Sequence, residues 1–171
     1  MGGGAWEAAA TGVTERQVIT RLVRLPDLRE VIEIERASFA DPWSRKAFES
    51  SIEPQRMRFL VAEDSLEGST GERRILGYVV ALLLLDEAEI ANLAVAPAAR
   101  RHGIGGLLLD RMSADLARDG VESLYLDVRE SNASARALYA SRSFQEVGRR
   151  RGYYRHPTED ALQLKRELAS A

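Results

Sequence analysis

One segment of the sequence combines a strand end, a glycine-rich turn and a helix start. The turn is formed by residues 100–106, Arg-Arg-His-Gly-Ile-Gly-Gly, and it follows the largely apolar run at residues 90–97. The first N–H groups of a helix have no partner inside the helix and lie at the positive end of its dipole. Glycines at this point let a phosphate approach the backbone. The segment therefore predicts a site for an anionic ligand that contains a pyrophosphate.

Two better-known phosphate-binding loops do not fit this segment. The dinucleotide-binding fingerprint requires a third glycine three residues after the second, and Leu108 occupies that position. A P-loop requires Gly-Lys followed by Ser or Thr, which the chain lacks. A purely structural explanation stays open beside the functional one, because glycines at a helix start also allow the helix to pack closely.

The composition excludes several kinds of protein. The 171 residues suit one domain, and 45% hydrophobic with 29% charged residues is typical of a soluble globular protein. The net charge of −2 gives no reason to expect nucleic acid or an anionic membrane as a partner. The absence of cysteine excludes disulfides, thiolate metal sites and a cysteine nucleophile, and it fits a reducing cytoplasm. We expect no metal, and no apolar run is long enough to span a bilayer.

Hydrophobic periodicity and turn residues predict elements in the order βααβββαβαββ. They follow residues 1–16, which lack a signal-peptide pattern and which we expect to be a disordered leader. Strands are expected at residues 17–24, 58–63, 75–85, 87–95, 123–129, 144–152 and 161–167. Helices are expected to begin at Pro26 and at Asp41-Pro42, with Asp41 as N-cap, and to cover residues 102–119 and 132–141.

The connection between the strands at 87–95 and 123–129 decides the predicted topology. A single helix joins these strands, and its apolar residues recur at every fourth position. Such a crossover makes its two strands parallel neighbours, whereas the short turn at Asp86 joins an antiparallel pair. The sequence predicts an α/β (α+β) fold with a mixed, mostly antiparallel seven-stranded sheet, helices on both faces, and one domain over residues 17–171.

The spacing Arg100-x-x-Gly103-x-Gly105, after the strand end at residues 93–97, resembles the acetyl-CoA motif of the GNAT superfamily of N-acetyltransferases. The predicted order of elements is also that of this family. The resemblance implies that the pyrophosphate of acetyl-CoA is bound by the backbone N–H groups of Arg101, His102, Gly103, Ile104, Gly105 and Gly106. It also implies that the backbone at Leu93, Ala94 and Val95 pairs with the pantetheine arm like an additional strand.

Further segments resemble the ribosomal-protein-alanine N-acetyltransferases of the RimI type, and the resemblance covers residues 17–168. They are residues 41–44 (Asp-Pro-Trp-Ser), 92–95 (Asn-Leu-Ala-Val), 126–132 (Leu-Asp-Val-Arg-Glu-Ser-Asn), 137–139 (Ala-Leu-Tyr) and 150–154 (Arg-Arg-Gly-Tyr-Tyr). The resemblance implies transfer of the acetyl group to the N-terminal α-amine of a ribosomal protein, with alanine as its first residue. It implies a cytoplasmic monomer or weak dimer that binds no nucleic acid or membrane.

The matching positions imply roles for individual residues. Asn132 matches an asparagine that contacts CoA, although an asparagine at a helix start is also a favourable N-cap. Tyr139 matches the general acid that returns a proton to the CoA thiolate, although a tyrosine also packs well at the edge of a core. The acceptor groove is expected to involve Trp43, Tyr153 and Tyr154, which could equally be core or rim residues.

Asp127 departs from the family, because the related enzymes have a glutamate as general base at this position. It alternates along its strand with the aliphatic Leu126 and Val128, so it faces away from them. Aspartate is one methylene shorter than glutamate, so we expect a water relay to the amine rather than direct contact. An ion pair with a nearby arginine such as Arg129 is the structural alternative, and we expect residues 149–151, all arginine, to form a solvated face.

The short carboxylate favours an α-amine as acceptor. An α-amine with a pKa of about 7.7–8.0 is roughly one-tenth neutral at pH 7, whereas a lysine with a pKa near 10.4 is less than about one-thousandth neutral. We expect direct transfer in a ternary complex, since no acyl-cysteine can form, with a backbone N–H near Leu93 stabilising the oxyanion. Three alternatives stay open: an acetyltransferase of lysine or a small amine, a non-catalytic CoA-binding module, and an interaction domain.

Overall fold

A computed structural model describes residues 16–52, 55–66 and 73–168. It contains a seven-stranded sheet with the spatial order β1-β2-β3-β4-β5-β7-β6. The strands are β1 (Arg16–Leu22), β2 (Met57–Leu66), β3 (Arg74–Leu84), β4 (Glu87–Val95), β5 (Ser123–Arg129), β6 (Gln145–Arg155) and β7 (Thr158–Glu167). The α-helices are α1 (Leu28–Ser38), α2 (Arg45–Ile52), α3 (Ile104–Arg118) and α4 (Ala133–Ala140), and 3₁₀ turns form at Leu25–Asp27 and Pro97–Ala99.

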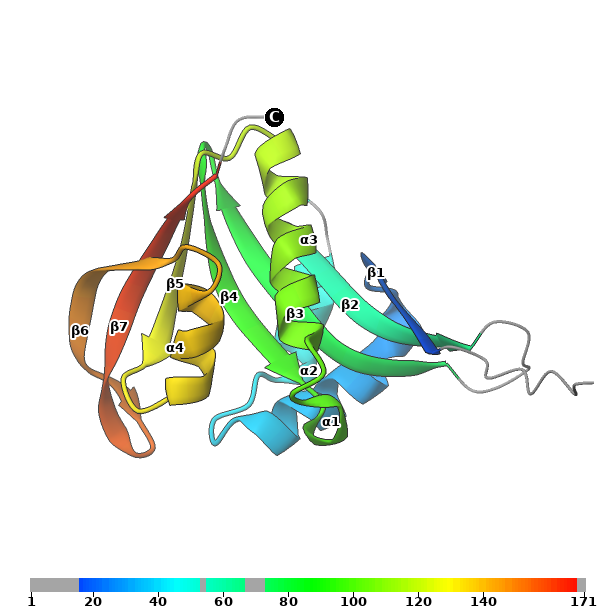
Figure 1. Cartoon of the computed structure of the whole chain (residues 1–171). Coiled ribbons are helices and arrows are strands. Elements are labelled where there is room, and N and C mark those ends of the chain that lie inside the picture. The colour runs from blue at the N-terminus through cyan, green and yellow to red at the C-terminus, as the bar shows by residue number, and fades with distance from the viewer. Residues whose placement is uncertain (1–15, 53–54, 67–72, 169–171) are drawn as a thin grey trace, which may run out of the picture.

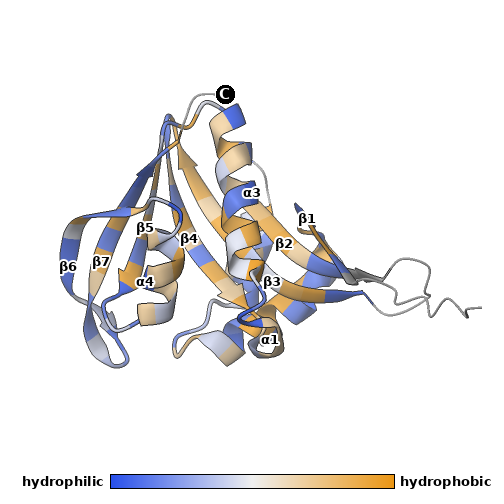
Figure 2. Cartoon of the chain, in the orientation of Figure 1, coloured by the Kyte–Doolittle hydropathy of each residue, from blue (hydrophilic) through white to orange (hydrophobic). Residues whose placement is uncertain are grey.

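The sheet separates two hydrophobic cores. Helices α3 and α4 pack on one face and helices α1 and α2 on the other, as Figure 1 shows. All neighbouring strands are antiparallel except β4 and β5, which are parallel. The predicted mixed sheet with helices on both faces is therefore confirmed. Apolar residues concentrate on the central strands, whereas the outermost strand β6 is polar along most of its length (Figure 2).

Helix α3 buries the apolar stripe that the sequence predicts. Ile104, Leu108, Met112 and Leu116 are all buried in the core beneath this helix. The helix lies close to β3, because a Cβ added at Gly77 would lie 3.2 Å from the side chain of Leu108. Among the described residues, no helix is both long and apolar enough to cross a membrane.

A β-bulge at Ala91 reverses the two faces of β4. The register with β3 shifts at this point, because Ile90 pairs with Ala81 whereas Asn92 pairs with Val80. Before the bulge, the even-numbered Ile90 faces the core under α3; after it, the even-numbered Ala94 faces the core under α1 and α2. An extra residue in one strand has this effect because side chains alternate between faces with a period of two.

The predicted start of the second helix is wrong. Helix α2 begins at Arg45, and the Ser44 hydroxyl accepts the N–H of Ala47 at 3.2 Å, which makes Ser44 the cap. Asp41 instead lies 2.9 Å from the ring nitrogen Nδ1 of His156. Two residues suited to an N-cap thus lie close together in the sequence, and tertiary contacts selected the later one.

Several other boundaries differ by a few residues. Strand β2 is longer than the predicted 58–63, and β6 and β7 extend the last hairpin to a short turn at residues 156–157. Pro26 belongs to a 3₁₀ turn that precedes α1 rather than to the helix itself. The expected leader lies outside the described residues, apart from Arg16, which begins β1.

The packing of α3 gives a stability prediction. Leu108 is fully buried, whereas its neighbour Leu107 is 38% exposed. We expect Leu108→Ala to lower the free energy of unfolding by about 2–5 kcal/mol, because it leaves a cavity between α3 and β3. The matched control Leu107→Ala is expected to change it by less than about 0.5 kcal/mol. Chemical denaturation measures both, and equal losses would contradict the packing described above.

Candidate active site

Strands β4 and β5 separate after a short paired stretch. Their parallel pairing runs only from Glu87 to Ile90 on β4, although β4 continues to Val95. Ala96 donates its N–H to the carbonyl of Leu76 on β3 at 2.8 Å. Because backbone groups alternate along a strand, the N–H groups of Leu93 and Val95 face away from β3. This part of β4 therefore presents a free edge toward β5.

A pocket of about 450 Å³ lies at this separation. Its walls come from α1, the segment between α1 and α2, β4, β5, α4 and the hairpin of β6 and β7. The pocket brings together seven of the fifteen site residues expected from the sequence, including both catalytic candidates and all three acceptor aromatics. These are Trp43, Leu93, Asp127, Asn132, Tyr139, Tyr153 and Tyr154, whereas Ala94, Val95 and residues 101–106 do not line it.

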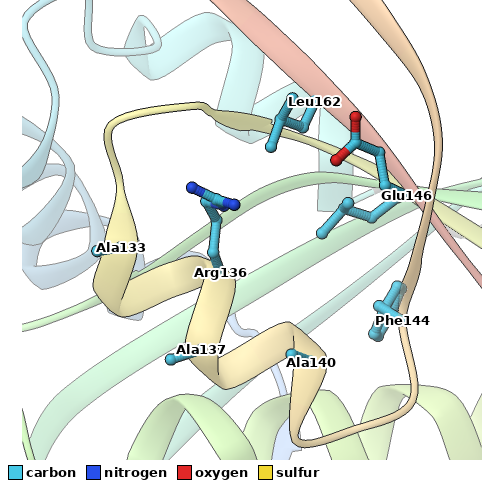
Figure 3. Close-up of a pocket in the computed structure, with 8 residues that line it drawn as sticks. Ala133, Arg136, Ala137, Ala140, Phe144, Glu146 and Leu162 are labelled. Carbon is cyan, nitrogen blue, oxygen red and sulfur yellow. The ribbon is translucent and has the colours of Figure 1, made fainter.

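A second hollow, of about 410 Å³, lies between α4 and the strands β6 and β7 (Figure 3). Its floor includes Phe144 and Leu162, and its charged lining residues are Arg136 and Glu146. Of the described residues that line it, none is a site residue expected from the sequence. We therefore place the chemistry in the pocket between β4 and β5.

The glycine-rich turn forms the start of α3. Gly103 has a φ of 78° and precedes the helix, and its carbonyl accepts the N–H of Leu107 at 3.0 Å. The N–H groups of the first helical turn lie beyond reach of any helical carbonyl, as an anion site requires. At position 105 there is little room for a larger side chain, because an added Cβ would lie 3.2 Å from Leu138. Close packing therefore explains Gly105, and backbone conformation explains Gly103.

Arg100 points away from the start of α3. Its Nε donates to the carbonyl of Val95 at 3.1 Å, and its Nη2 donates to the hydroxyl of Ser38 at 3.1 Å. Its carbonyl oxygen lies 2.8 Å from Nδ1 of His102. Arg100 thus connects the end of β4 to α1, and its guanidinium is not part of the anion site expected from the sequence.

Asp127 lies in the pocket with its carboxylate almost completely buried. Its side chain is 8% exposed, and neither oxygen has a hydrogen-bond partner within the described part of the chain. Burial raises the pKa of this carboxyl group, and the guanidinium of Arg150, 3.4 Å away, opposes the shift. The prediction that Asp127 faces away from the aliphatic residues of β5 is confirmed, since Leu126 and Val128 lie in the opposite core.

The structural alternative for Asp127, an ion pair with a nearby arginine, is confirmed, but the partner is Arg150 at 3.4 Å rather than Arg129. Arg129 instead pairs with Glu159 at 3.2 Å, and its guanidinium lies 4.1 Å from the ring centre of Tyr154. Residues 149–151 are likewise only partly a solvated face, because Arg149 pairs with surface carboxylates whereas Arg150 reaches Asp127. The reason is that β6 lies beside β7, which lies beside β5, an arrangement that local sequence does not reveal.

Helix α4 positions two of the expected residues. The side chain of Asn132 accepts the N–H of Ala135 at 3.1 Å, so its N-cap role is confirmed. Tyr139 is buried against Phe144, with 5.7 Å between ring centres. Burial, with a smaller effect of Tyr154, raises the pKa of Tyr139 to about 12. The hydroxyl group is therefore protonated at neutral pH and available as a proton donor.

The three expected acceptor aromatics lie around the mouth of the pocket. The ring of Trp43 packs on Phe48 at 5.4 Å, so it is both a core residue and a pocket wall. Tyr153 is 47% exposed and meets Tyr154 edge to face at 5.2 Å. Tyr153 is therefore partly exposed at the pocket, and Tyr154 lies between Tyr153 and the guanidinium of Arg129.

Glu89 is a pocket residue that the sequence reasoning missed. It lies opposite Tyr125 in the parallel register, two positions before the level of Asp127. Burial and the nearby Asp127 raise its pKa, and Arg150 opposes the shift. Its position between the apolar Ala88 and Ile90 was a signal, because that alternation places Glu89 on the face that Asp127 shares.

Glu35 is a second missed residue of the pocket wall. It occupies a position on the apolar stripe of α1, four residues after Val31, and only 1% of it is exposed. A charged residue type at a predicted core position was the available signal, since glutamate is almost never fully buried without partners. Those partners come from other segments of the chain, so the periodicity of α1 could not reveal them.

Comparisons with known proteins agree with this geometry. Residues 28–144 match the acetyltransferase (GNAT) family. The ribosomal protein bS18-alanine N-acetyltransferase of Escherichia coli K12 is 37% identical over 134 residues, which cover 78% of this chain and 84% of that protein. The corresponding protein of Salmonella typhimurium is 39% identical over 140 residues, which cover 80% and 88% of the two chains.

Solved structures show the same fold. The crystal structure of the ribosomal-protein-S18-alanine N-acetyltransferase from Escherichia coli matches with a TM-score of 0.78 and 32% identity, over 91% of this chain and 96% of that one. Arabidopsis thaliana NAA60 in complex with acetyl-CoA matches in fold alone, with a TM-score of 0.79 and 20% identity over 89% and 99% of the two chains. The chain therefore belongs to the acetyltransferase (GNAT) family, as a relative of its ribosomal protein bS18-alanine N-acetyltransferases.

Proposed function

We propose that this protein transfers the acetyl group of acetyl-CoA to the N-terminal α-amine of a ribosomal protein that begins with alanine. The observation that supports this most is the pocket between β4 and β5, which combines the Asp127 carboxylate, the Tyr139 hydroxyl and the free edge of β4. The relatives are named for their action on ribosomal protein bS18, and this supports a ribosomal protein as the acceptor. The proposed place of action is the cytoplasm.

The donor substrate would bind along β4 and at the start of α3. The N–H groups of Leu93 and Val95 face the gap and can pair with the amide groups of the pantetheine arm. The carbonyl of Val95 already accepts a hydrogen bond from Arg100, so the backbone N–H of Val95 is the group that remains available to the ligand. The helix start at residues 101–106 would bind the pyrophosphate, because its N–H groups and helix dipole favour an anion.

The pocket residues have distinct roles in the proposed reaction. The neutral amine attacks the thioester carbonyl, so that a C–N bond forms and the C–S bond breaks. Asp127 accepts the proton that the amine loses, through a water molecule, and Tyr139 donates a proton to the departing thiolate. The N–H of Leu93 stabilises the developing oxyanion. Positioning of the two bound substrates supplies much of the remaining acceleration.

Glu89 adds a second carboxylate beside Asp127. Both carboxylates lie near the guanidinium of Arg150, and Arg129 also lines the pocket. A cationic ammonium group is favoured where carboxylates lie close by, so this arrangement suits an acceptor that arrives protonated. The ammonium group loses its first proton to solvent before the attack, and Asp127 accepts the second proton as the C–N bond forms.

The acceptor class can be tested with a panel of amines at pH 7. We expect peptides beginning with Ala, Ser or Met to be acetylated about 100-fold faster than an internal lysine in an N-terminally blocked peptide, because far more of the α-amine is neutral. Mass spectrometry identifies the modified nitrogen. Preferential acetylation of lysine or a small amine would contradict the proposal, and tight acetyl-CoA binding without transfer would indicate a non-catalytic module.

The pKa shifts predict the pH dependence of kcat. Asp127 acts as a carboxylate, so kcat is lost as the pH falls through a pKa that burial has raised above its usual range. Tyr139 acts in its protonated form, and its pKa of about 12 predicts no loss of kcat from this group up to about pH 10.

Two variants show which group causes the loss of kcat at low pH, the acid limb of the pH profile. Asp127→Asn is expected to lower kcat about 100-fold and to remove the acid limb. Tyr139→Phe is also expected to lower kcat about 100-fold, but it should keep the acid limb. Asp127→Asn should not lower the melting temperature, because it removes a buried carboxylate without hydrogen bonds. An unchanged acid limb in Asp127→Asn would assign the base elsewhere.

The proposed pyrophosphate site has a matched control at the other end of α3. Gly103 and Gly120 have φ values of 78° and 87°, and an added Cβ meets nothing within 4 Å at either position. Alanine at either position is therefore expected to cost a similar, roughly 1–2 kcal/mol of stability. Only Gly103→Ala should weaken acetyl-CoA binding, about tenfold by calorimetry, because it distorts the N–H groups that face the phosphates. Equal binding by both variants would contradict this placement.

A further inference from the structure

One wall of the pocket depends on a buried carboxylate that the proposed chemistry does not use. Glu35, on α1, is 1% exposed and accepts hydrogen bonds from three residues of different segments. The backbone N–H of Trp43 donates to it at 2.7 Å, and the side-chain amide of Asn92 lies 3.1 Å from both of its oxygens. The hydroxyl of Tyr78 on β3 is the third donor.

The carboxylate of Glu35 is stable in this buried position only when its hydrogen-bond donors surround it, so their arrangement is specific. A carboxyl group buried without hydrogen bonds costs several kcal/mol, so its partners must be present together. Burial and Glu35 raise the pKa of the Tyr78 hydroxyl far above its usual range, so this hydroxyl keeps its proton and donates. No ion pair of Glu35 with Lys, Arg or His occurs in the described ranges, so neutral donors alone satisfy it.

Two of the three donors come from different segments that line the pocket. Trp43 belongs to the segment between α1 and α2, which lines the pocket with residues 39–41 and 43. Asn92 follows the bulge of β4 and immediately precedes Leu93, whose N–H faces the gap. The distance between the acceptor wall and the free edge of β4 is thus fixed through one side chain. The segment's exposed contact, between Asp41 and His156, contributes little in comparison.

We infer that Glu35 is a positioning residue for the acceptor, which acts by holding Trp43 and its segment at a fixed distance from β4. This inference rests on the proposed function, because it assigns the wall at residues 39–43 to the incoming amine. Glu35 itself touches neither the proposed general base nor the phosphate site. Because Asn92 is also held by its strand pairing with Val80, the loss of Glu35 releases mainly the Trp43 segment and leaves donor binding and the chemical groups in place.

The first test is kinetic and uses Glu35→Gln. Glutamine has nearly the same volume but only one accepting oxygen, so it cannot accept hydrogen bonds from Trp43, Asn92 and Tyr78 together. We expect the KM for an alanine-starting peptide to rise about tenfold, the loss of a hydrogen bond to a charged group. The KM for acetyl-CoA and the kcat at saturating peptide should stay within about twofold, since their groups are untouched.

Tyr78→Phe is the matched control. It removes one donor to the same carboxylate, at the oxygen other than the one that accepts the N–H of Trp43. We expect it to lower the melting temperature by roughly 2–6 °C and to leave the peptide KM unchanged. An equal rise in peptide KM in both variants would show that Glu35 acts through general stability, and would overturn the inference.

A second measurement does not depend on activity or on a stable variant. Hydrogen exchange in the wild-type protein should show a protected Trp43 amide, because its N–H is bound to a buried oxygen. Glu35→Gln should speed this exchange at least about tenfold, and Tyr78→Phe should not. A rapidly exchanging Trp43 amide in the wild type would refute the positioning role. Failure of acetyl transfer with normal protection would refute only the proposed function.

Discussion

The separation of β4 from β5 is the constraint on which the rest of the site depends. Backbone N–H groups inside a protein need partners, and a sheet normally supplies them from the next strand. Here β5 supplies them only as far as Ile90, so the remaining N–H groups on that edge of β4 are left for a ligand with amide groups. The helices α1 and α4, the hairpin of β6 and β7, and the segment before α2 all line this one gap.

The bulge at Ala91 determines which side chains of β4 lie beside that gap. Without the extra residue, Asn92 and Ala94 would face the core under α3, and Leu93 would face α1. With it, Glu89 and Asn92 lie on the same face of β4, beside the carboxylate of Asp127 on β5. A one-residue irregularity therefore combines the acidic groups with the hydrogen bonds to Glu35 on one side of the sheet.

Local periodicity predicted the element order, the mixed sheet, the stripe of α3 and the face of Asp127, because each depends on residues close together in sequence. The rest depended on contacts between distant segments. The bulge at Ala91 leaves an apparently uninterrupted alternation, and the partner of Asp127 is Arg150 because β6 and β7 fold back beside β5. Asp41 and Ser44 were both suited to begin α2, and only the position of His156 explains the role of Asp41.

The strand order also bears on how the protein forms during synthesis. Strand β7 lies between β5 and β6, so β6 is synthesised before the strand that connects it to the sheet. Until residues 158–167 insert, β5 exposes an unpaired edge, and Tyr153, Tyr154 and Arg150 have no fixed place beside the pocket. A chain in which every proposed chemical group is already synthesised therefore still lacks one wall of its pocket until β7 pairs with β5.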